Sequence, residues 1–132
     1  MLIELFSLAE KFADAFNRRD VNALGDLLCS DATAEVVGSG WPEEQGRAAI
    51  LATSIPHIMD EGTPLAAEAR HSGDGVFVLL RRKNGGELDT VLRCQSRDGK
   101  ISRLDYLVTG FCRAEMARLA EPLGIPLCRD DE

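Results

Sequence analysis

The residues of this sequence that are best suited to chemistry are His57 and Tyr106. A histidine titrates near neutral pH and can therefore accept or donate a proton, while a tyrosine offers an apolar ring with a hydrogen-bonding hydroxyl. If both side chains face one cavity, His57 is the candidate general base and Tyr106 the group that orients a substrate oxygen. The simpler alternatives are a partly exposed histidine beside Pro56 and a tyrosine of the core or rim.

Two further features have both a functional and a structural interpretation. Trp41, the only tryptophan, either anchors a ligand at the mouth of a pocket or packs beneath a loop. The basic run at 81–83 is most simply a solvated strand end, with a phosphate or carboxylate clamp as the alternative. Another group of charged and polar residues is expected to form cross-strand pairs on the outer face of a sheet. Its members are Asp89, Arg93, Gln95, Arg103 and Asp105.

Composition narrows the classes of function. The chain has 132 residues, which fits one domain. A net charge of -7 makes nucleic acid and anionic membrane poor partners, and no apolar run is long enough to span a bilayer. None of the four cysteines belongs to a C-x-x-C pair or has a histidine at zinc-ligand spacing. We therefore expect reduced thiols, no metal, no cofactor and a cytoplasmic location.

The first half of the sequence has helical periodicity. Apolar residues at 5, 8, 12 and 16 predict an amphipathic helix over 2–18, and Asp20 is a plausible N-cap for a short second helix. A short strand is expected at 32–37. A third helix should begin near Gly46 and be kinked or restarted at Pro56, because proline lacks the N–H of the helical ladder.

The second half changes to the period of strands. We expect strands at 66–72, 76–83, 88–96 and 101–109, separated by turns that contain glycine at 73–75, 84–86 and 98–99. Three successive hairpins make an antiparallel meander, and helices followed by a meander indicate an α+β fold. A last helix is expected at 113–123. The domain should span 1–124, and residues 125–132 should form a charged tail.

Three motifs in this order resemble the nuclear transport factor 2-like superfamily, which includes ketosteroid isomerases and SnoaL-like polyketide cyclases. They are FNRRDV with LLCSDAT at 16–21 and 27–33, GRAAI at 46–50, and DGKI followed by Tyr106. The resemblance covers about residues 3–111. It implies a cystatin-like cone in which N-terminal helices pack on a curved antiparallel sheet and enclose a pocket. It also implies a homodimer formed through the outer face of the sheet.

The resemblance places apolar residues where the isomerases carry their catalytic groups. The tyrosine position falls on Phe12, the base position on Val36 and the acid-donor position on Leu92. The epoxide hydrolase relatives use an Arg-x-Asp and a later Asp. Here the first part reads Arg82-Lys83-Asn84 and the last position falls on Tyr106. Both catalytic sets are thus incomplete.

The sequence therefore predicts an apolar pocket for a small hydrophobic molecule that can carry a carbonyl. Polar character should come from Thr53, His57 and Tyr106. The expected lining residues are Phe12, Val36, Trp41, Thr53, Leu92 and Leu104. Three functions remain open: an isomerase, cyclase or hydrolase without the known catalytic set, a non-catalytic ligand-binding module, and a dimeric scaffold.

Overall fold

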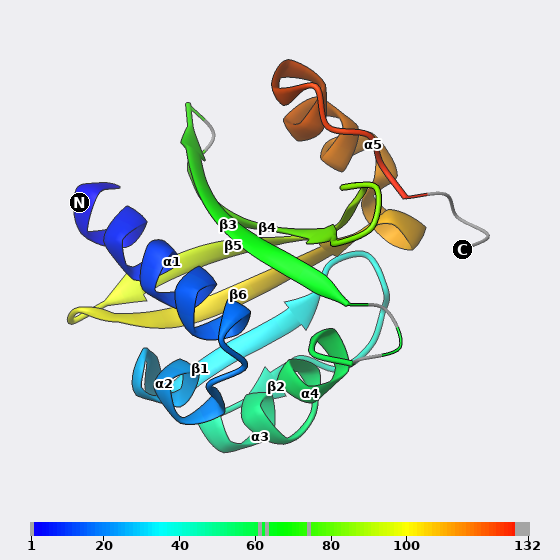
Figure 1. The fold of residues 1–132 in the computed structure, drawn as a ribbon. Helices are drawn as coiled ribbons and strands as arrows, with labels where there is room; N and C mark the ends of the chain where they lie inside the picture. The colour runs from blue at the N-terminus through cyan, green and yellow to red at the C-terminus, as the bar shows by residue number, and fades with distance from the viewer. Residues whose placement is uncertain (1, 61, 63, 74, 129–132) are drawn as a thin grey trace.

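The computed structural model describes residues 2–60, 62, 64–73 and 75–128, and it contains helices packed on one curved sheet (Figure 1). The helices are α1 (Leu2–Asn17), α2 (Val21–Asp26), α3 (Arg47–Ala52), α4 (Ser54–Ile58), α5 (Thr109–Ala120) and the 3-10 turn η1 (Glu121–Leu123). The strands are β1 (Leu28–Val36), β2 (Glu44–Gln45), β3 (Leu65–Ser72), β4 (Gly75–Arg82), β5 (Leu88–Arg97) and β6 (Lys100–Val108). The predicted α+β class and the predicted meander are confirmed.

The sheet has the order β2-β1-β6-β5-β4-β3. Strands β3 to β6 pair antiparallel with their neighbours, as the glycine turns predict. The expectation of a wholly antiparallel sheet needs one correction, because β1 pairs with β6 in parallel. Strands so distant in the sequence are not joined by a short turn, so no local sequence signal predicts that they pair. The turn residue Asp74 lies outside the described residues.

The segment around α2 differs from the prediction at its end. The Asp20 side chain accepts a hydrogen bond from the Ala23 N–H at 3.0 Å, which confirms it as the N-cap. Strand β1 then begins at Leu28, four residues before the predicted start at residue 32. Leu28, which follows α2 by only two residues, already pairs with Ile101 of β6.

The inner face of the sheet packs on α1. Its main core joins Phe12 and Phe16 of α1 to alternate residues of every long strand, such as Leu92 and Leu104. Asn17, at the end of α1, closes the edge of β3: its amide donates to the Ala67 C=O at 2.9 Å and accepts from the Ala67 N–H at 2.7 Å. The helix thus supplies the partner that a further strand would supply.

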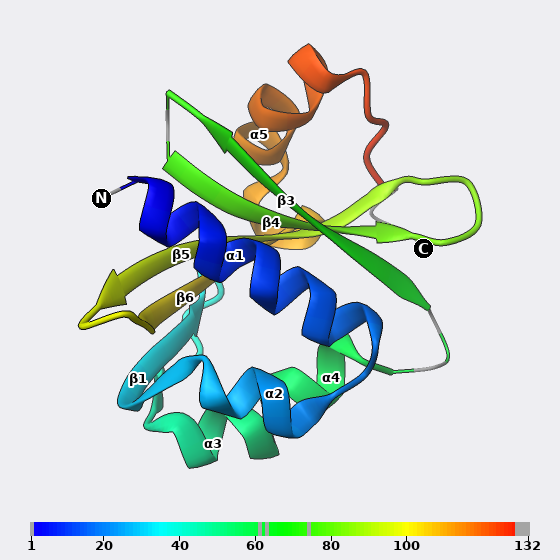
Figure 2. The ribbon, with the colours of Figure 1, turned by 60° about the vertical axis from the view of Figure 1, so that its left-hand side comes forward.

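The outer face carries a second, smaller core under α5, so α1 and α5 lie on opposite faces of the sheet (Figure 2). Leu79 and Leu107 of the sheet pack with Met116 of α5 and with Ile125 beyond it. The stretch predicted as a charged tail therefore begins as an ordered segment. Leu127 bridges to Leu88 of β5, whereas residues 129–132 lie outside the described residues. The last helix begins at Thr109 rather than at residue 113.

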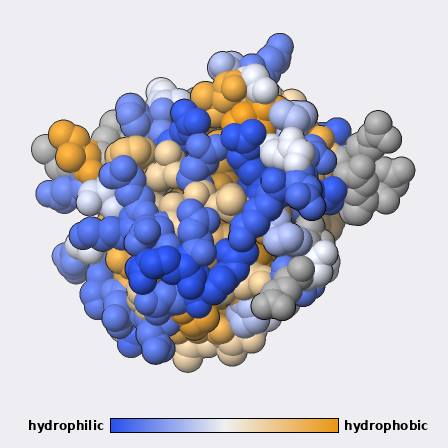
Figure 3. Space-filling view, viewed as in Figure 1, coloured by the Kyte–Doolittle hydropathy of each residue, from blue (hydrophilic) through white to orange (hydrophobic). Residues whose placement is uncertain are grey.

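The third predicted helix is two helices that break at Thr53, three residues before Pro56. Pro56 then lies in the first turn of α4, where its missing N–H breaks no helical hydrogen bond. Thr53, the residue before α4, makes no side-chain cap hydrogen bond, and Ser54 is the first residue of the helix. The surface seen in Figure 3 is mostly hydrophilic, with hydrophobic residues between the charged ones.

Candidate functional site

A cavity of about 380 Å³ lies between α4, the loop that follows β1, and the inner face of the sheet. Apolar side chains make up much of its wall. Two pairs of polar side chains, at two places, also line it, together with His57, Asp60 and Arg82. The lining residues are Val36, Trp41, Ser54, His57, Ile58, Asp60, Leu65, Arg82, Asp89, Thr90, Tyr106, Val108 and Phe111. A site of this size and mixed lining is typical of small-molecule pockets.

The first polar place is a pair of hydroxyls. The Ser54 Oγ and the Tyr106 hydroxyl oxygen lie 2.7 Å apart, and the Ser54 N–H donates to a Glu44 carboxylate oxygen at 3.2 Å. Tyr106 is only 2% exposed, and this burial raises the pKa of its phenol far above the ordinary value. Tyr106 is therefore a protonated hydrogen-bonding group over the whole physiological pH range.

His57 borders the same cavity as Tyr106 but in a different environment. It lies in the last turn of α4, and its side chain is exposed at the mouth. The two residues chosen from the sequence as candidate catalytic groups therefore share one cavity, one in the wall and one at the rim. This arrangement allows a ligand to meet both, while solvent also reaches the imidazole.

The structure brings some of the expected lining residues to the cavity and not others. Val36 and Trp41 are in its wall. Phe12, Leu92 and Leu104 are not, because each is completely buried in the main core between α1 and the sheet. Thr53 is exposed at the break between α3 and α4, and the next residue, Ser54, faces the cavity. Phe12, Leu92, Leu104 and Thr53 thus lie outside the wall of this cavity.

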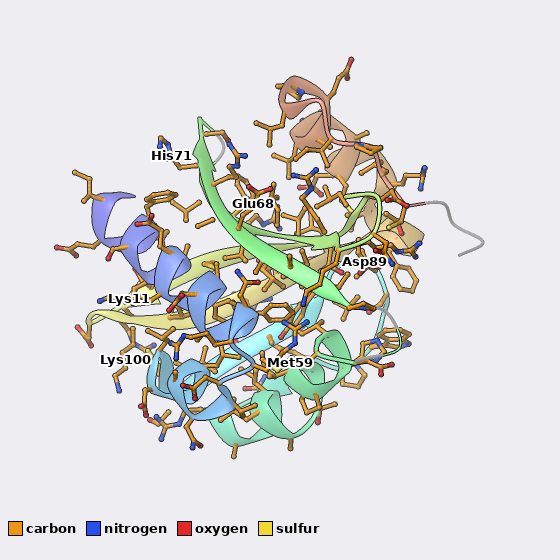
Figure 4. The ribbon with its side chains drawn as sticks, in the orientation of Figure 1. Lys11, Met59, Glu68, His71, Asp89 and Lys100 are labelled. Carbon is orange, nitrogen blue, oxygen red and sulfur yellow. The ribbon has the colours of Figure 1, made fainter. Side chains whose placement is uncertain are left out.

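The second polar place was missed by the sequence reasoning. Asp89 and Thr90 both line the cavity, and the Thr90 Oγ1 donates to the Asp89 Oδ1 at 2.7 Å. Strict alternation along β5 would turn Asp89 to the outer face, but the strand contains a bulge at this point. Figure 4 shows Asp89 at the end of the sheet near α5. In the sequence, Gly85, Gly86 and Glu87 shortly before Asp89 were the available signal of an irregular start to this strand.

Two aromatic side chains border the mouth. Trp41 and Phe111 meet edge to face, with ring centroids 5.5 Å apart, and they are 62% and 46% exposed. Phe111 comes from the first turn of α5, beside the loop that carries Trp41. Exposed aromatic rings beside a cavity offer apolar contact area to a ligand.

The outer face holds the cross-strand ion pairs that the sequence predicts. Asp105 is 7% exposed and lies between Arg103, whose Nε donates to it at 3.0 Å, and Arg93 at 3.6 Å. Arg93 also reaches Glu115 of α5 at 2.9 Å, and Arg103 reaches Glu43 at 2.7 Å. These hydrogen bonds raise the pKa of Arg103 and lower that of Glu43. Asp89 does not belong to this network.

The described part of the chain contains neither a metal-ligand cluster nor a membrane-spanning helix. No group of three or more His, Cys, Asp or Glu side chains there could hold a metal ion. Among the same residues, no helix has the length and apolar character needed to cross a bilayer. The four cysteines are all buried.

The same fold occurs in several solved structures. A candidate ketosteroid isomerase from Kribbella flavida has a TM-score of 0.62 and 22% identity, with 81% of this chain and 78% of that chain covered. A candidate polyketide cyclase from Sinorhizobium meliloti has a TM-score of 0.56 and 24% identity, with coverages of 76% and 93%. An LEH-like epoxide hydrolase from M. tuberculosis has a TM-score of 0.58 and 16% identity, with coverages of 91% and 98%.

No family model matches the sequence, and no curated protein matches it. The structural likenesses show that this chain has the nuclear transport factor 2-like fold, in which helices pack on a curved sheet. This is the fold of SnoaL-like and ketosteroid isomerase-like proteins, as the sequence motifs predict. At such low identity the likeness establishes the fold alone, and function must be argued from the site.

Proposed function

We propose that this protein binds a small, mostly hydrocarbon molecule that carries a carbonyl or hydroxyl oxygen. The observation that supports this most strongly is the Ser54–Tyr106 hydroxyl pair in the wall of an otherwise largely apolar cavity. A hydroxyl can donate one hydrogen bond while it accepts others. Ser54 can therefore donate to Tyr106 while the Tyr106 hydroxyl donates to the ligand oxygen.

The size of the cavity limits the ligand. A volume of about 380 Å³ accommodates roughly a dozen water-sized groups, each of which occupies about 30 Å³ in the liquid. The aliphatic residues Val36, Ile58 and Leu65 would contact the hydrocarbon part, and the exposed rings of Trp41 and Phe111 would cover it at the mouth. A monocyclic ketone with a short side chain meets these requirements.

Binding can be measured through Trp41, because it is the only tryptophan and it borders the cavity. We expect benzylacetone to change the tryptophan emission in a saturable way. Tyr106→Phe should weaken its binding about five- to tenfold, which corresponds to one lost hydrogen bond. Ser54→Ala removes the other hydroxyl of the pair. Its matched control is Thr53→Ala, since Thr53 lies outside the cavity wall. Absence of saturable binding by benzylacetone and by related small ketones would refute the proposal.

A second candidate is catalysis on such a ligand. It is supported by the position of His57 and Tyr106 on one cavity. His57 would remove a proton from the carbon next to the carbonyl while Tyr106 stabilises the oxygen. The apolar residues Phe12, Val36 and Leu92 exclude the catalytic set of the isomerases.

The catalytic candidate is tested by deuterium exchange into bound benzylacetone, followed by NMR in heavy water. Catalysis predicts exchange at the carbons next to the carbonyl, with a loss of at least tenfold in His57→Gln and unchanged binding. Saturable binding without exchange would leave the protein a non-catalytic ligand-binding module. A dimeric scaffold and a cytoplasmic location stay predictions.

A further inference from the structure

Asp89 enters the cavity because β5 contains one extra residue. Leu80 of β4 pairs with Thr90, but the next residue, Arg81, pairs with Leu88, so Asp89 has no partner on β4. In a regular strand Asp89 and Thr90 would point to opposite faces of the sheet. The bulge allows both to line the cavity, as bulges beside functional sites commonly re-aim a side chain.

The C-terminal segment fixes the residue next to this bulge. The Leu88 N–H donates to the Pro126 C=O at 2.7 Å, and the Leu88 C=O accepts from the Cys128 N–H at 3.0 Å. The segment itself is anchored, because Ile125 is buried and the Arg113 side chain donates to the Cys128 C=O at 2.6 Å. The segment 125–128 thus holds Leu88, the residue next to the bulge, on both its backbone groups.

Thr90 fixes the carboxylate of Asp89. Thr90 is 2% exposed, and its hydroxyl donates to one carboxylate oxygen of Asp89. An ionised carboxylate has about four acceptor sites and no donor. Asp89 can therefore accept further hydrogen bonds from a hydroxyl or ammonium group within the cavity, but it repels an anion.

The two polar places are separated by a distance that the strand register defines. On the inner face, Tyr106 pairs with Leu92 and Val108 pairs with Thr90. These two rows are two residues apart, and each residue advances a strand by about 3.3 Å, so Asp89 and Tyr106 lie roughly 7 to 10 Å apart along the strands. Apolar residues, including Val108, lie between them.

We propose that the cavity is a two-ended site for a molecule with an acceptor oxygen at one end and a hydrogen-bond donor at the other. Tyr106 with Ser54 binds the carbonyl or hydroxyl oxygen, and Asp89 binds a hydroxyl or amine. The C-terminal segment 125–128 is a positioning element that holds Asp89 in place. This inference rests on the proposed binding function and specifies the class of ligand.

The test compares two probes that differ by one hydroxyl: benzylacetone and para-hydroxybenzylacetone. Both carry the ketone for Tyr106, and only the second carries a donor at the far end of the ring. The readout is the ratio of their dissociation constants, which cancels general effects of a substitution on the cavity. In the unmodified protein we expect para-hydroxybenzylacetone to bind about tenfold more tightly, as for one hydrogen bond to a charged group.

Four variants test whether Asp89 causes the tighter binding of para-hydroxybenzylacetone. Asp89→Ala should reduce the ratio to about one, and Asp89→Asn should reduce it in part. Asp60→Ala is the matched control, because Asp60 is also a carboxylate of the cavity lining, and it should leave the ratio near ten. Arg113→Ala loosens the C-terminal segment and should lower the ratio while the binding of benzylacetone is unchanged.

The outcomes separate this inference from the proposed function. If benzylacetone binds but the hydroxyl adds no affinity, the two-ended site is wrong and the proposed function stands. If neither probe binds, both are wrong. An equal loss of preference in Asp60→Ala and Asp89→Ala would also overturn the inference, because the donor would then be recognised by the general acidity of the mouth.

Discussion

Ser54 and Tyr106 are 52 residues apart in the sequence, yet their hydroxyl oxygens lie 2.7 Å apart in the wall of the cavity. Ser54 is the first residue of α4, and Tyr106 is on the inner face of β6. The contact thus joins the layer of short helices to the sheet and places two hydroxyls in the cavity wall. The same pair has a structural role and a proposed role in binding.

The structural role predicts a coupled effect on stability. Ser54→Ala and Tyr106→Phe should each lower the free energy of unfolding by about 1 to 2 kcal/mol, because each leaves a partly or fully buried hydroxyl without its partner. The double variant should lose about 1 kcal/mol less than the sum. Urea unfolding measures this cycle, with Thr53→Ala as the control. Strictly additive losses would mean that the hydroxyls do not interact.

Buried thiol and phenol groups predict a loss of stability at alkaline pH. Burial raises the pKa of Cys94 to about 12 and raises that of Tyr106 as well, whereas unfolded values are about 8.5 and 10. The unfolded chain therefore loses these protons first, so stability falls as pH rises from about 8.5 toward 12. Each group contributes at most about 1.4 kcal/mol per pH unit.

The measurement is urea unfolding of the native protein and of Cys94→Ala between pH 8 and pH 11. The native curve should fall more steeply than the curve of the variant, and the difference should begin near pH 8.5. Parallel curves would contradict the assignment. A thiol reagent should likewise label Cys94 only as fast as the protein unfolds.

The sequence predicted the meander well because its turns are local. The glycine turns at 84–86 and 98–99 fix which strands are neighbours, and their φ angles are positive as such turns require. Strand β1 was placed less accurately. Its pairing with β6 depends on residues about 70 positions away, such as Thr33 with Arg103, and local periodicity contains no information about such a partner.

The site was predicted less completely than the fold, for two geometric reasons. The break at Thr53 shifts the helical phase by one residue, so that Ser54 rather than Thr53 faces the cavity. The bulge in β5 breaks the alternation that placed Asp89 on the outer face. In the strand, one extra residue moves a side chain from one face to the other, and at Thr53 the break between two helices decides which of two neighbouring residues faces the cavity.

Asn17 offers a prediction about the edge of the sheet. Its side chain makes two hydrogen bonds with the backbone of Ala67, at 2.7 and 2.9 Å. Asn17→Ala should therefore lower the free energy of unfolding by about 1 to 3 kcal/mol. Asn17→Asp keeps the acceptor and loses the donor, so it should also destabilise. Asn22, an exposed asparagine of α2, is the control, and its replacement by alanine should change stability by less than about 0.5 kcal/mol.

A homodimer stays a prediction, and the structure limits where it could form. The C-terminal helix α5 covers one part of the outer face, so the free part lies over β1, β6 and the adjoining end of β5. We expect light scattering to give twice the chain mass of 14.4 kDa. Gln95→Arg, at an exposed position of that area, should shift the protein toward the monomer, and Asn22→Arg should not. A monomer at micromolar concentration would contradict the prediction.

Substitution of Asp105 should lower the free energy of unfolding more than substitution of an ordinary surface charge does. Its buried carboxylate is shared by Arg93 and Arg103, which link the sheet to α5 and to the loop before β2. Breaking a fully buried ion pair commonly costs about 3 to 5 kcal/mol. The loss of Asp105 should cost less than that, because Arg93 and Arg103 are partly exposed and keep carboxylate partners. The exposed pair Asp14–Arg18 on α1 is the comparison, because such pairs contribute only about 0.3 to 0.5 kcal/mol.

Urea unfolding of Asp105→Ala and Asp14→Ala tests this difference directly. Asp105→Ala should be destabilised by about 1 to 3 kcal/mol, and Asp105→Leu by less, because an apolar side chain fills the space while Arg93 keeps Glu115 and Arg103 keeps Glu43 as partners. Because α5 depends on Arg93, amide exchange in α5 should also accelerate in Asp105→Ala before the rest of the chain opens. Equal, small effects at positions 14 and 105 would mean that water compensates the arginines and that the network contributes little to holding α5 on the sheet.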